Sequence, residues 1–355
     1  MGSEIRLFIV DDSAFMRQVI SRIAERDRQI VIAGRARNGQ EAVEKIAALK
    51  PDVVTLDVEM PVMDGLATLE KIMEMYPVPV IMLSSLTRDS ARVTMKALEL
   101  GAVDFMPKPA EREQLNNMQF ELLSKIKIAA TIPVAAKKFY RPLKEIPPAA
   151  AAAADTAPVQ PGDIRAVVIG TSTGGPSALQ QVIPKLPRNL AASVLIVQHM
   201  PKGFTKALAE RLNQNSPMEV REAENGDLVR PGRALIAPAG KHMYLERISG
   251  EIKISLREEA SVETLFKPSV DVTMLSAAEI YGKHLLGVIM TGMGKDGVRG
   301  LHKIKALGGK VLAEAEETCV VFGMPKAAIQ EGLVDEIHPV DQLAAGIIRA
   351  VGKEK

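Results

Sequence analysis

One serine in the chain has sequence neighbours that are typical of a catalytic nucleophile or of a phosphate-binding turn. Ser172 lies in "VVIGTSTGGPSAL" (167–179), where an apolar run leads into a glycine-rich turn and then a helix-like stretch. Its immediate surroundings match the pattern G-x-S-x-G, which holds a serine nucleophile on a sharp turn between a strand and a helix. The same kind of turn can instead bind a phosphate through its backbone N–H groups. The segment by itself leaves both interpretations open.

A serine nucleophile needs a base to take its proton and an acid to orient that base. The segment "SVLIVQHMP" puts His199 at the end of the strand after the serine's strand–helix unit, and consecutive elements are usually neighbours in space. Asp296 closes the glycine-rich loop of "LLGVIMTGMGKDG", at or near the N-cap of the next helix. An aspartate there also fits a simple helix cap, although the glycines of the loop favour close approach to a ligand. We predict Ser172, His199 and Asp296 as a catalytic triad, with His242 as the rival base.

Hydrolysis also needs hydrogen-bond donors for the charge that develops on the substrate oxygen. We expect the backbone N–H groups of Thr173 and Met293 to supply them. The phosphate-binding alternative is weaker, because "GTSTGG" lacks the Walker lysine and does not match G-x-G-x-x-G. It also leaves "VQHMP" and "TGMGKDG" without roles. Acyl hydrolysis is therefore the favoured chemistry, and dinucleotide or phosphate binding is the alternative.

A second group of residues that could carry chemistry, made of carboxylates, a hydroxyl and a lysine, lies in the first third of the chain. Asp11 and Asp12 follow the apolar run "FIV", Asp57 ends "VVTLD", Ser84 ends "VIMLS", and Lys108 follows "FMP". Two carboxylates can hold Mg²⁺, and a third can attack a phosphoryl group while the lysine neutralises developing charge. Aspartates also end strands simply because turns favour them, but a lysine and a hydroxyl at matching strand ends favour phosphoryl chemistry.

The elements that must position these residues are alternating strands and helices. Short Val- and Ile-rich runs alternate with stretches whose apolar residues recur every three and four positions, five times within 1–124. This pattern predicts an α/β fold, a flavodoxin-like five-stranded parallel sheet. The pattern resumes at 163–355, where we expect a doubly wound α/β domain with a mostly parallel sheet and a β-hairpin near 243–256.

Between these two domains we place a linker at 125–162, rich in proline and alanine. Composition favours an extended, semi-rigid tether there. Charge differs along the chain. Residues 1–124 carry 15 Lys and Arg against 19 Asp and Glu (−4), and the linker carries 6 against 2 (+4).

Composition also limits the class of protein. The 355 residues are 47% hydrophobic and 25% charged, with a net charge of +2, which predicts a globular protein with no nucleic-acid partner. The single cysteine, Cys319, excludes an internal disulfide and favours a reducing, cytoplasmic setting. We find no signal peptide and no apolar run long enough to span a bilayer, so no membrane insertion is expected.

Residues 5 to about 122 resemble the receiver domain of two-component response regulators. The resemblance rests on "FIVDDS", "VVTLDVEMP", "VIMLSS" and "FMPKP". It implies that Asp57 is phosphorylated and that Asp11, Asp12 and Asp57 bind Mg²⁺. It also implies that the Ser84 hydroxyl and the Lys108 cation sense the phosphoryl group. Phe105 matches the aromatic position that repacks on activation.

Residues 163 to about 352 resemble the catalytic domain of chemotaxis protein-glutamate methylesterases and glutamine deamidases (the CheB family). "IGTSTGGP", "QHMP", "APAGKHM", "KPSVD" and "MTGMGKDG" stand at that family's signatures. Family members often carry Arg at Lys267, and lysine lacks the fork geometry of Arg.

This second resemblance implies hydrolysis of γ-glutamyl methyl esters, and deamidation of selected glutamines, on methyl-accepting chemoreceptors. It implies control by a chemotaxis histidine kinase as phosphodonor, with Mg²⁺ serving phosphorylation only and no cofactor for the esterase.

Overall fold

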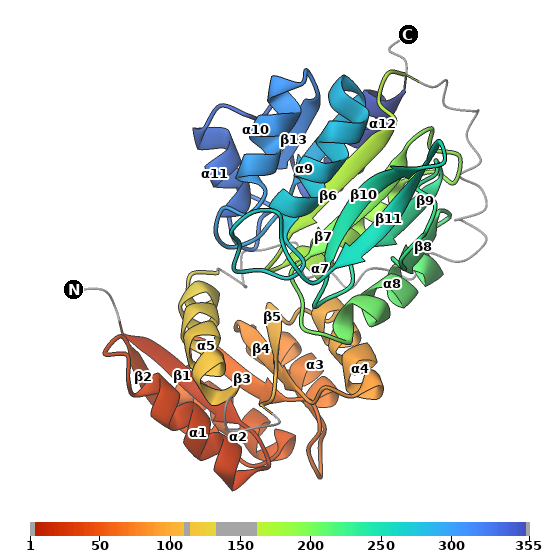
Figure 1. Ribbon diagram of the computed structural model, residues 1–355. Coiled ribbons are helices and arrows are strands. Elements are labelled where there is room, and N and C mark those ends of the chain that lie inside the picture. Colours follow the sequence, from red (N-terminus) through yellow and green to blue (C-terminus); the bar gives the residue numbers. More distant parts are fainter. Residues whose placement is uncertain (1–3, 110–113, 133–161, 353–355) are drawn as a thin grey trace. The chain divides into compact units, whose positions relative to one another are not determined.

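The computed structural model describes residues 4–109, 114–132 and 162–352 (Figure 1). The chain divides into two compact units, Met1–Leu143 and Lys144–Lys355, called here the N-terminal and C-terminal units. Most of the predicted linker, residues 133–161, lies outside the described residues. No helix within the described ranges is long and apolar enough to cross a membrane.

The N-terminal unit contains the predicted five-stranded parallel sheet, in the order β2-β1-β3-β4-β5. Every residue of β3 and β4 is buried, as expected for central strands covered on both faces. The strand order reverses between β1 and β3. In α/β sheets, ligands bind beside the carboxyl ends of the two strands between which the order reverses. The strands are β1 (Ile5–Val10), β2 (Ile30–Ala36), β3 (Val53–Asp57), β4 (Val80–Ser84) and β5 (Asp104–Pro107).

Helices cover both faces of this sheet, because right-handed crossovers place α1 on one face and the next three helices on the other. Four of them begin at a residue whose side-chain oxygen accepts a backbone N–H from three residues later: Ser13, Asn38, Asp64 and Thr87. These residue types are the favoured N-caps. The helices are α1 (Ala14–Ala24), α2 (Gly39–Leu49), α3 (Gly65–Met75), α4 (Arg88–Glu99) and α5 (Gln114–Ala130).

Helix α5 continues past the domain boundary that we predicted at residue 124. Residues 125–130, assigned to the linker from composition, form its last turns. Ile126 and Ala129 are buried, and Lys125 Nζ lies 2.6 Å from Asp104 Oδ2 in β5. Apolar packing and an ion pair therefore bind this stretch to the N-terminal unit, a tertiary effect that composition does not reveal.

The C-terminal unit has a seven-stranded parallel sheet in the order β14-β13-β12-β6-β7-β9-β8, together with the predicted hairpin. The short edge strands β8 and β14 were not predicted, because "EVRE" and "EIH" carry few apolar residues. The sheet strands are β6 (Ala166–Thr171), β7 (Ser193–Gln198), β8 (Glu219–Glu222), β9 (Arg233–Ile236), β12 (Leu285–Ile289), β13 (Lys310–Glu314) and β14 (Glu336–His338), and the hairpin strands are β10 (His242–Ile248) and β11 (Glu251–Arg257).

The strand order of this sheet reverses between β6 and β12. The β6–α7–β7 crossover runs in one direction and the β12–α10–β13 crossover in the other, which puts α7 and α10 on opposite faces. The carboxyl ends of β6 and β12 thus form a topological switch point, where α/β sheets open a crevice. The helices are α7 (Gly175–Val182), α8 (Phe204–Asn215), α9 (Val270–Tyr281), α10 (Val298–Ala306), α11 (Met324–Gln330) and α12 (Val340–Val351), with short 3₁₀ turns at Ile183–Lys185 and Gly282–His284.

Candidate active site and phosphorylation site

Ser172 and His199 lie side by side at the switch point of the C-terminal unit. Each follows directly on a strand end, and the two preceding residues, Thr171 and Gln198, are paired in the parallel ladder of β6 and β7. The Gln198 side chain also holds the two loops next to each other, because its Nε2 donates to the carbonyls of both Ser172 and His199 at 2.9 Å. The sequence reasoning missed Gln198, although it immediately precedes the predicted base.

The loop after β12 supports the serine from the other side. The Ser172 N–H donates to the carbonyl of Thr291 at 3.0 Å, and the Thr291 hydroxyl donates to the carbonyl of Thr173 at 2.9 Å. Gly292 lies so close that a Cβ there would be 2.8 Å from Ser172 Cβ, so any larger residue would displace the serine. Buried Glu314 in turn accepts the Thr291 N–H at 2.8 Å.

His199 and Asp296 form the predicted pair, with His199 Nε2 at 2.8 Å from Asp296 Oδ2. The other ring nitrogen, Nδ1, is buried and has no hydrogen-bond partner among the described residues. The Phe266 ring stacks on the imidazole, with centroids 4.1 Å apart and planes at 4°. Nδ1 is therefore the nitrogen left to accept a proton, although no hydrogen bond joins it to Ser172 in the part of the chain described.

Asp296 does not cap the helix that follows it, because Gly297 occupies the N-cap of α10. Its carboxylate instead accepts from the Ser269 hydroxyl (2.9 Å) and from the Val270 and Asp271 N–H groups (2.7 and 3.0 Å) at the start of α9. Burial would raise the pKa of Asp296, but the bond from His199 and the backbone N–H groups outweigh burial and lower it. The carboxylate is thus held ionised and aimed at His199.

Two of these supports escaped the sequence reasoning. Phe266 and Ser269 flank "KP" in the "KPSVD" region, where only Lys267 had been weighed. His242, the rival base, is buried, and burial followed by the charge of Lys267 lowers its pKa. The other three histidines bond elsewhere, His284 to the carbonyl of Asp163, His302 to Glu331 and His338 to Glu336.

The two predicted oxyanion donors flank the serine. Thr173 follows Ser172 directly, and Met293 follows Gly292, whose backbone packs on Ser172. Among the residues that the structure describes, neither the Thr173 nor the Met293 N–H donates a hydrogen bond. Both donors therefore remain available for a substrate oxygen.

The N-terminal unit gathers the predicted carboxylates and lysine at its own switch point. Lys108 Nζ lies 2.6 Å from Asp57 Oδ2 and 3.0 Å from Asp11 Oδ2. Burial raises the pKa of Asp57 to about 6, against the opposing effect of Lys108. Burial would lower the pKa of Lys108, but the carboxylates of Asp57 and Asp11 raise it.

The same carboxylates suit a hard metal ion. Asp11, Asp12 and Asp57 each offer one oxygen, and these oxygens lie within 4.8 Å of one another. Oxygen donors of this kind are what Mg²⁺ prefers, and exposed Asp12 leaves room for the waters that Mg²⁺ retains. The residues present therefore fit the predicted ion.

Ser84 and Phe105 lie on the neighbouring strands β4 and β5, and both are buried. The Ser84 hydroxyl accepts from Thr94 Oγ1 of α4 at 2.9 Å, and its own proton can reach the carbonyl of Ser85 at 3.2 Å or that of Ser90 at 3.4 Å. In this structure the hydroxyl is thus engaged with α4.

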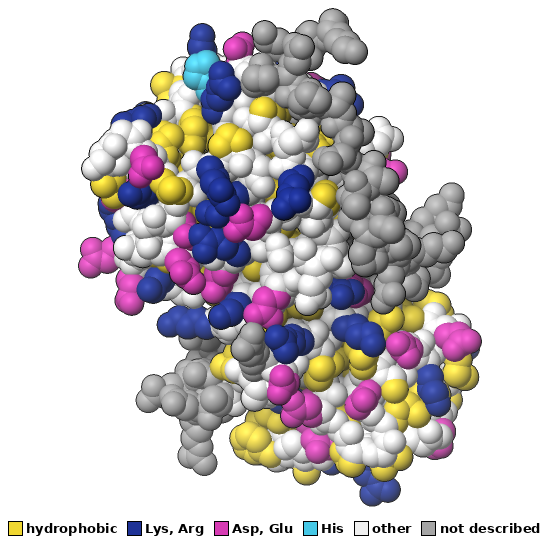
Figure 2. Space-filling view, turned by 90° about the vertical axis from the view of Figure 1, so that its right-hand side faces the viewer, with side chains coloured by type: hydrophobic (Ala, Val, Ile, Leu, Met, Phe, Trp, Pro, Cys, Tyr) yellow, Lys and Arg dark blue, Asp and Glu magenta, His cyan; other side chains and the backbone are white. Residues whose placement is uncertain are grey.

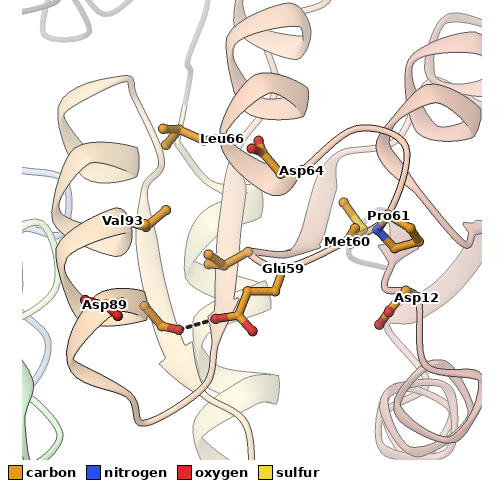
Figure 3. Close-up of a pocket in the computed structure, with 10 residues that line it drawn as sticks. Asp12, Glu59, Met60, Pro61, Asp64, Leu66, Asp89 and Val93 are labelled. Atoms are coloured by element: carbon orange, nitrogen blue, oxygen red, sulfur yellow. Dashed lines mark hydrogen bonds between the residues drawn. The ribbon is translucent and has the colours of Figure 1, made fainter.

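Beside this site a cavity of about 480 Å³ opens to the surface (Figure 3). Asp12 lies at one side of it and Glu59 at its centre, where Glu59 hydrogen-bonds Ser90 at the start of α4. Asp64 and Asp89 add two further acidic side chains to the lining. The carboxylates that line this cavity favour a bound cation.

Comparison with known proteins finds a matching family for each of the two units. The CheB methylesterase family model matches residues 167–347, and the response regulator receiver domain model matches residues 7–119. A Moorella thermoacetica protein named protein-glutamate methylesterase/protein-glutamine glutaminase is 44% identical over 99% of this chain and 99% of its own length. A Geobacillus kaustophilus protein of the same name is 47% identical over 98% of this chain and 99% of its own length. The crystal structure of the Thermotoga maritima CheB methylesterase catalytic domain is 47% identical, with a TM-score of 0.52, and covers 53% of this chain and 99% of that domain.

Fold and site together define a hydrolase that carries a response-regulator receiver domain in front of its catalytic domain. The chain belongs to the CheB methylesterase family. The N-terminal unit is its receiver domain, and the C-terminal unit is its catalytic domain.

Proposed function

We propose that this chain removes methyl groups from γ-glutamyl methyl esters of chemoreceptors, and deamidates selected glutamines there, under control of phosphorylation at Asp57. The observation that carries the proposal is the His199–Asp296 pair (2.8 Å) beside Ser172 at the switch point of a CheB-family fold. Its setting would be the cytoplasmic signalling helices of methyl-accepting chemoreceptors.

In the first step the Ser172 hydroxyl attacks the ester carbonyl, and His199 Nδ1 takes the proton. The N–H at His199 Nε2 donates to Asp296, which stabilises the imidazolium and keeps the ring oriented. The N–H groups of Thr173 and Met293 stabilise the negative oxygen of the tetrahedral intermediate. Collapse of that intermediate breaks the C–O bond, and the leaving methoxide takes the proton from His199 as methanol.

Water then attacks the acyl-serine, with His199 again taking a proton and returning it to Ser172. Glutamate is the product. With a glutamine substrate the same steps release ammonia in place of methanol, because only the leaving group differs.

The receiver domain supplies control. A carboxylate oxygen of Asp57 attacks the phosphorus of the phosphodonor, a chemotaxis histidine kinase, and its histidine departs. Lys108, 2.6 Å from Asp57, neutralises charge on the phosphoryl oxygens. Asp11, Asp12 and Asp57 would hold Mg²⁺, which when bound neutralises further charge.

The test is methanol release from methylated chemoreceptor membranes, with and without acetyl phosphate. The unmodified chain should release methanol faster with the phosphodonor, and Asp57→Ala should lose that stimulation. Ser172→Ala should lose at least about a thousand-fold in turnover while keeping its melting temperature. Near-normal activity of Ser172→Ala contradicts the nucleophile, and equal stimulation of Asp57→Ala contradicts the switch.

A further inference from the structure

Three loops that each carry an exposed lysine are in contact with one another beside His199. Lys202 comes three residues after His199, Lys241 follows the turn after β9, and Lys267 follows Phe266, whose ring stacks on His199. All three side chains are exposed. Lys202, Lys241 and Lys267 are called here the lysine cluster.

The backbone of Gly240 holds the cluster together. Its N–H donates to the carbonyl of Lys267 at 3.0 Å, and Lys241 is the next residue. A Cβ on Gly240 would lie 2.3 Å from Cε of Lys202, so the Lys202 stem crosses this backbone closely. Gly240 has φ +86°, a conformation that glycine adopts without strain. The three chain segments are therefore in direct contact.

The positive charge of the lysine cluster is not paired within the described part of the chain. None of the three lysines forms an ion pair with any residue that the structure describes. Some other cations of the catalytic domain do have a carboxylate partner, as where Arg230 and Arg233 lie 2.9 and 3.1 Å from Glu219. The side of the molecule in Figure 2 likewise mixes Lys and Arg with Asp and Glu. Unmatched like charges held together create a local field that attracts anions.

The charge of Lys267 extends to His242, a buried histidine outside the triad that the charge of Asp296 also influences. After burial, the charge of Lys267 is the next cause that lowers the pKa of buried His242, while Asp296 acts in the opposite sense. The same loop presents an apolar contact, because the Leu265 side chain is 97% exposed two residues before Lys267. The loop that carries Phe266, whose ring stacks on His199, thus combines positive charge with an exposed leucine.

We propose that the lysine cluster binds a carboxylate side chain of the substrate protein close to the esterified glutamate. The enzyme then selects methyl esters that lie in acidic segments, and Leu265 contacts an apolar side chain of the same segment. The inference rests on the proposed function, since it takes Ser172 as the nucleophile. Lysine suits this role as a compact point charge that binds a carboxylate without requiring a fork geometry.

The test uses two synthetic peptides of equal length, each with one γ-methyl glutamate, flanked by glutamates in one and glutamines in the other. Methanol release by the full chain, activated with acetyl phosphate and Mg²⁺, gives kcat/KM for each peptide. We expect kcat/KM to be about ten-fold or more higher for the acidic peptide. The preference should shrink in about 1 M salt, where charges are screened within roughly 3 Å.

The triple variant Lys202→Gln, Lys241→Gln, Lys267→Gln should bring the ratio of the two kcat/KM values close to one. The corresponding triple Arg variant should keep the preference, because it restores the charge. A matched control removes three exposed cations at the amino edge of the same sheet, with Arg165→Gln, Lys283→Gln and Lys310→Gln, and should keep the ratio of the unmodified chain.

Because Lys267 adjoins Phe266, the double variant Lys202→Gln, Lys241→Gln separates charge from stacking, and it too should lower the ratio. Equal kcat/KM for both peptides in the unmodified chain, or an unchanged ratio in the triple Gln variant, overturns the inference and leaves the esterase standing. Hydrolysis of neither peptide overturns the proposed function and the inference with it.

Discussion

At the scale of single residues, the site depends on which groups hold Asp296. Among the described residues its carboxylate accepts four hydrogen bonds, from His199, Ser269, Val270 and Asp271, and none of them comes from α10, the helix that follows it. This places the orienting acid at the positive N-terminal end of α9. The side chain that favours the imidazolium is therefore itself fixed by a helix that begins 26 residues earlier in the chain.

Asp296→Asn should lower kcat by about a thousand-fold or more, because an amide cannot stabilise the imidazolium and can fix the wrong tautomer. The control is Asp335→Asn. Asp335 lies away from the triad, and its Oδ1 is 2.5 Å from Lys305 Nζ. Methanol release from a methylated receptor preparation measures both. A loss of less than ten-fold in Asp296→Asn would contradict the role of Asp296.

Asp296 should also give stability a pH dependence. Folding lowers its pKa below 3.8, so its contribution to the free energy of unfolding is complete above that pH and is lost as the pH falls through the folded pKa. The stability difference between the unmodified chain and Asp296→Asn, about 1–3 kcal/mol at neutral pH, should thus shrink below pH 3.8. Urea titrations followed by circular dichroism at several pH values check this, and a difference that grows with acid would refute it.

At the scale of elements, the catalytic groups are set by loops that follow neighbouring strands. The loop after β12 holds the loop after β6 through Thr291, which accepts hydrogen bonds from Thr171 and Ser172 on its carbonyl (2.7 and 3.0 Å). Its hydroxyl donates to Thr173 and accepts from Val321 at 3.0 Å. Thr291 thus connects the nucleophile to the strand that carries buried Glu314.

Thr291→Val keeps the side-chain shape but removes the hydroxyl that fixes the carbonyl of Thr173. We expect kcat to fall by about 10- to 100-fold, because small misplacements of a reacting group are costly, while KM changes little. Thr291→Ser restores the hydroxyl and should recover most of the activity. Equal kcat for the Val variant and the unmodified chain would show that Thr291 does not position the serine.

At the scale of the whole molecule, two sheets each place their chemistry at a switch point, and a tether joins the two domains. A tether keeps the effective concentration of one domain near the other high, so a weak interaction suffices for control. The proposed control is that the unphosphorylated receiver domain restrains the catalytic domain. Phosphorylation of Asp57 would then shift that equilibrium.

A protein that starts at residue 141 should have higher basal esterase activity than the full chain, by about 5- to 150-fold, the usual range of coupling between two sites. It should not respond to acetyl phosphate. Full-length Asp57→Ala, which keeps the receiver domain, should stay at the low basal rate. A truncated enzyme no faster than the full chain would contradict restraint by the receiver domain.

Much of this protein is determined by local sequence patterns. Alternating Val- and Ile-rich runs and helical periodicity predict both parallel sheets. They also put Ser172, His199, Asp57 and Lys108 at strand ends, and in the structure each of these residues directly follows or ends a strand. Parallel strands end at one edge of a sheet, so residues at strand ends are brought together whatever the details of packing. The weakly apolar edge strands β8 and β14 lie beyond this reasoning.

Tertiary structure alone decided how the site is held. Contacts between distant segments turn Nε2 of His199 toward Asp296 and place the carboxylate at the start of α9. Such contacts also stack Phe266 on the imidazole and let Gln198 and Thr291 support the serine. The same holds for the lysine cluster, whose members lie up to 65 residues apart in sequence. Local periodicity specifies which face of an element is buried, but crossovers and loop packing decide which partner it meets there.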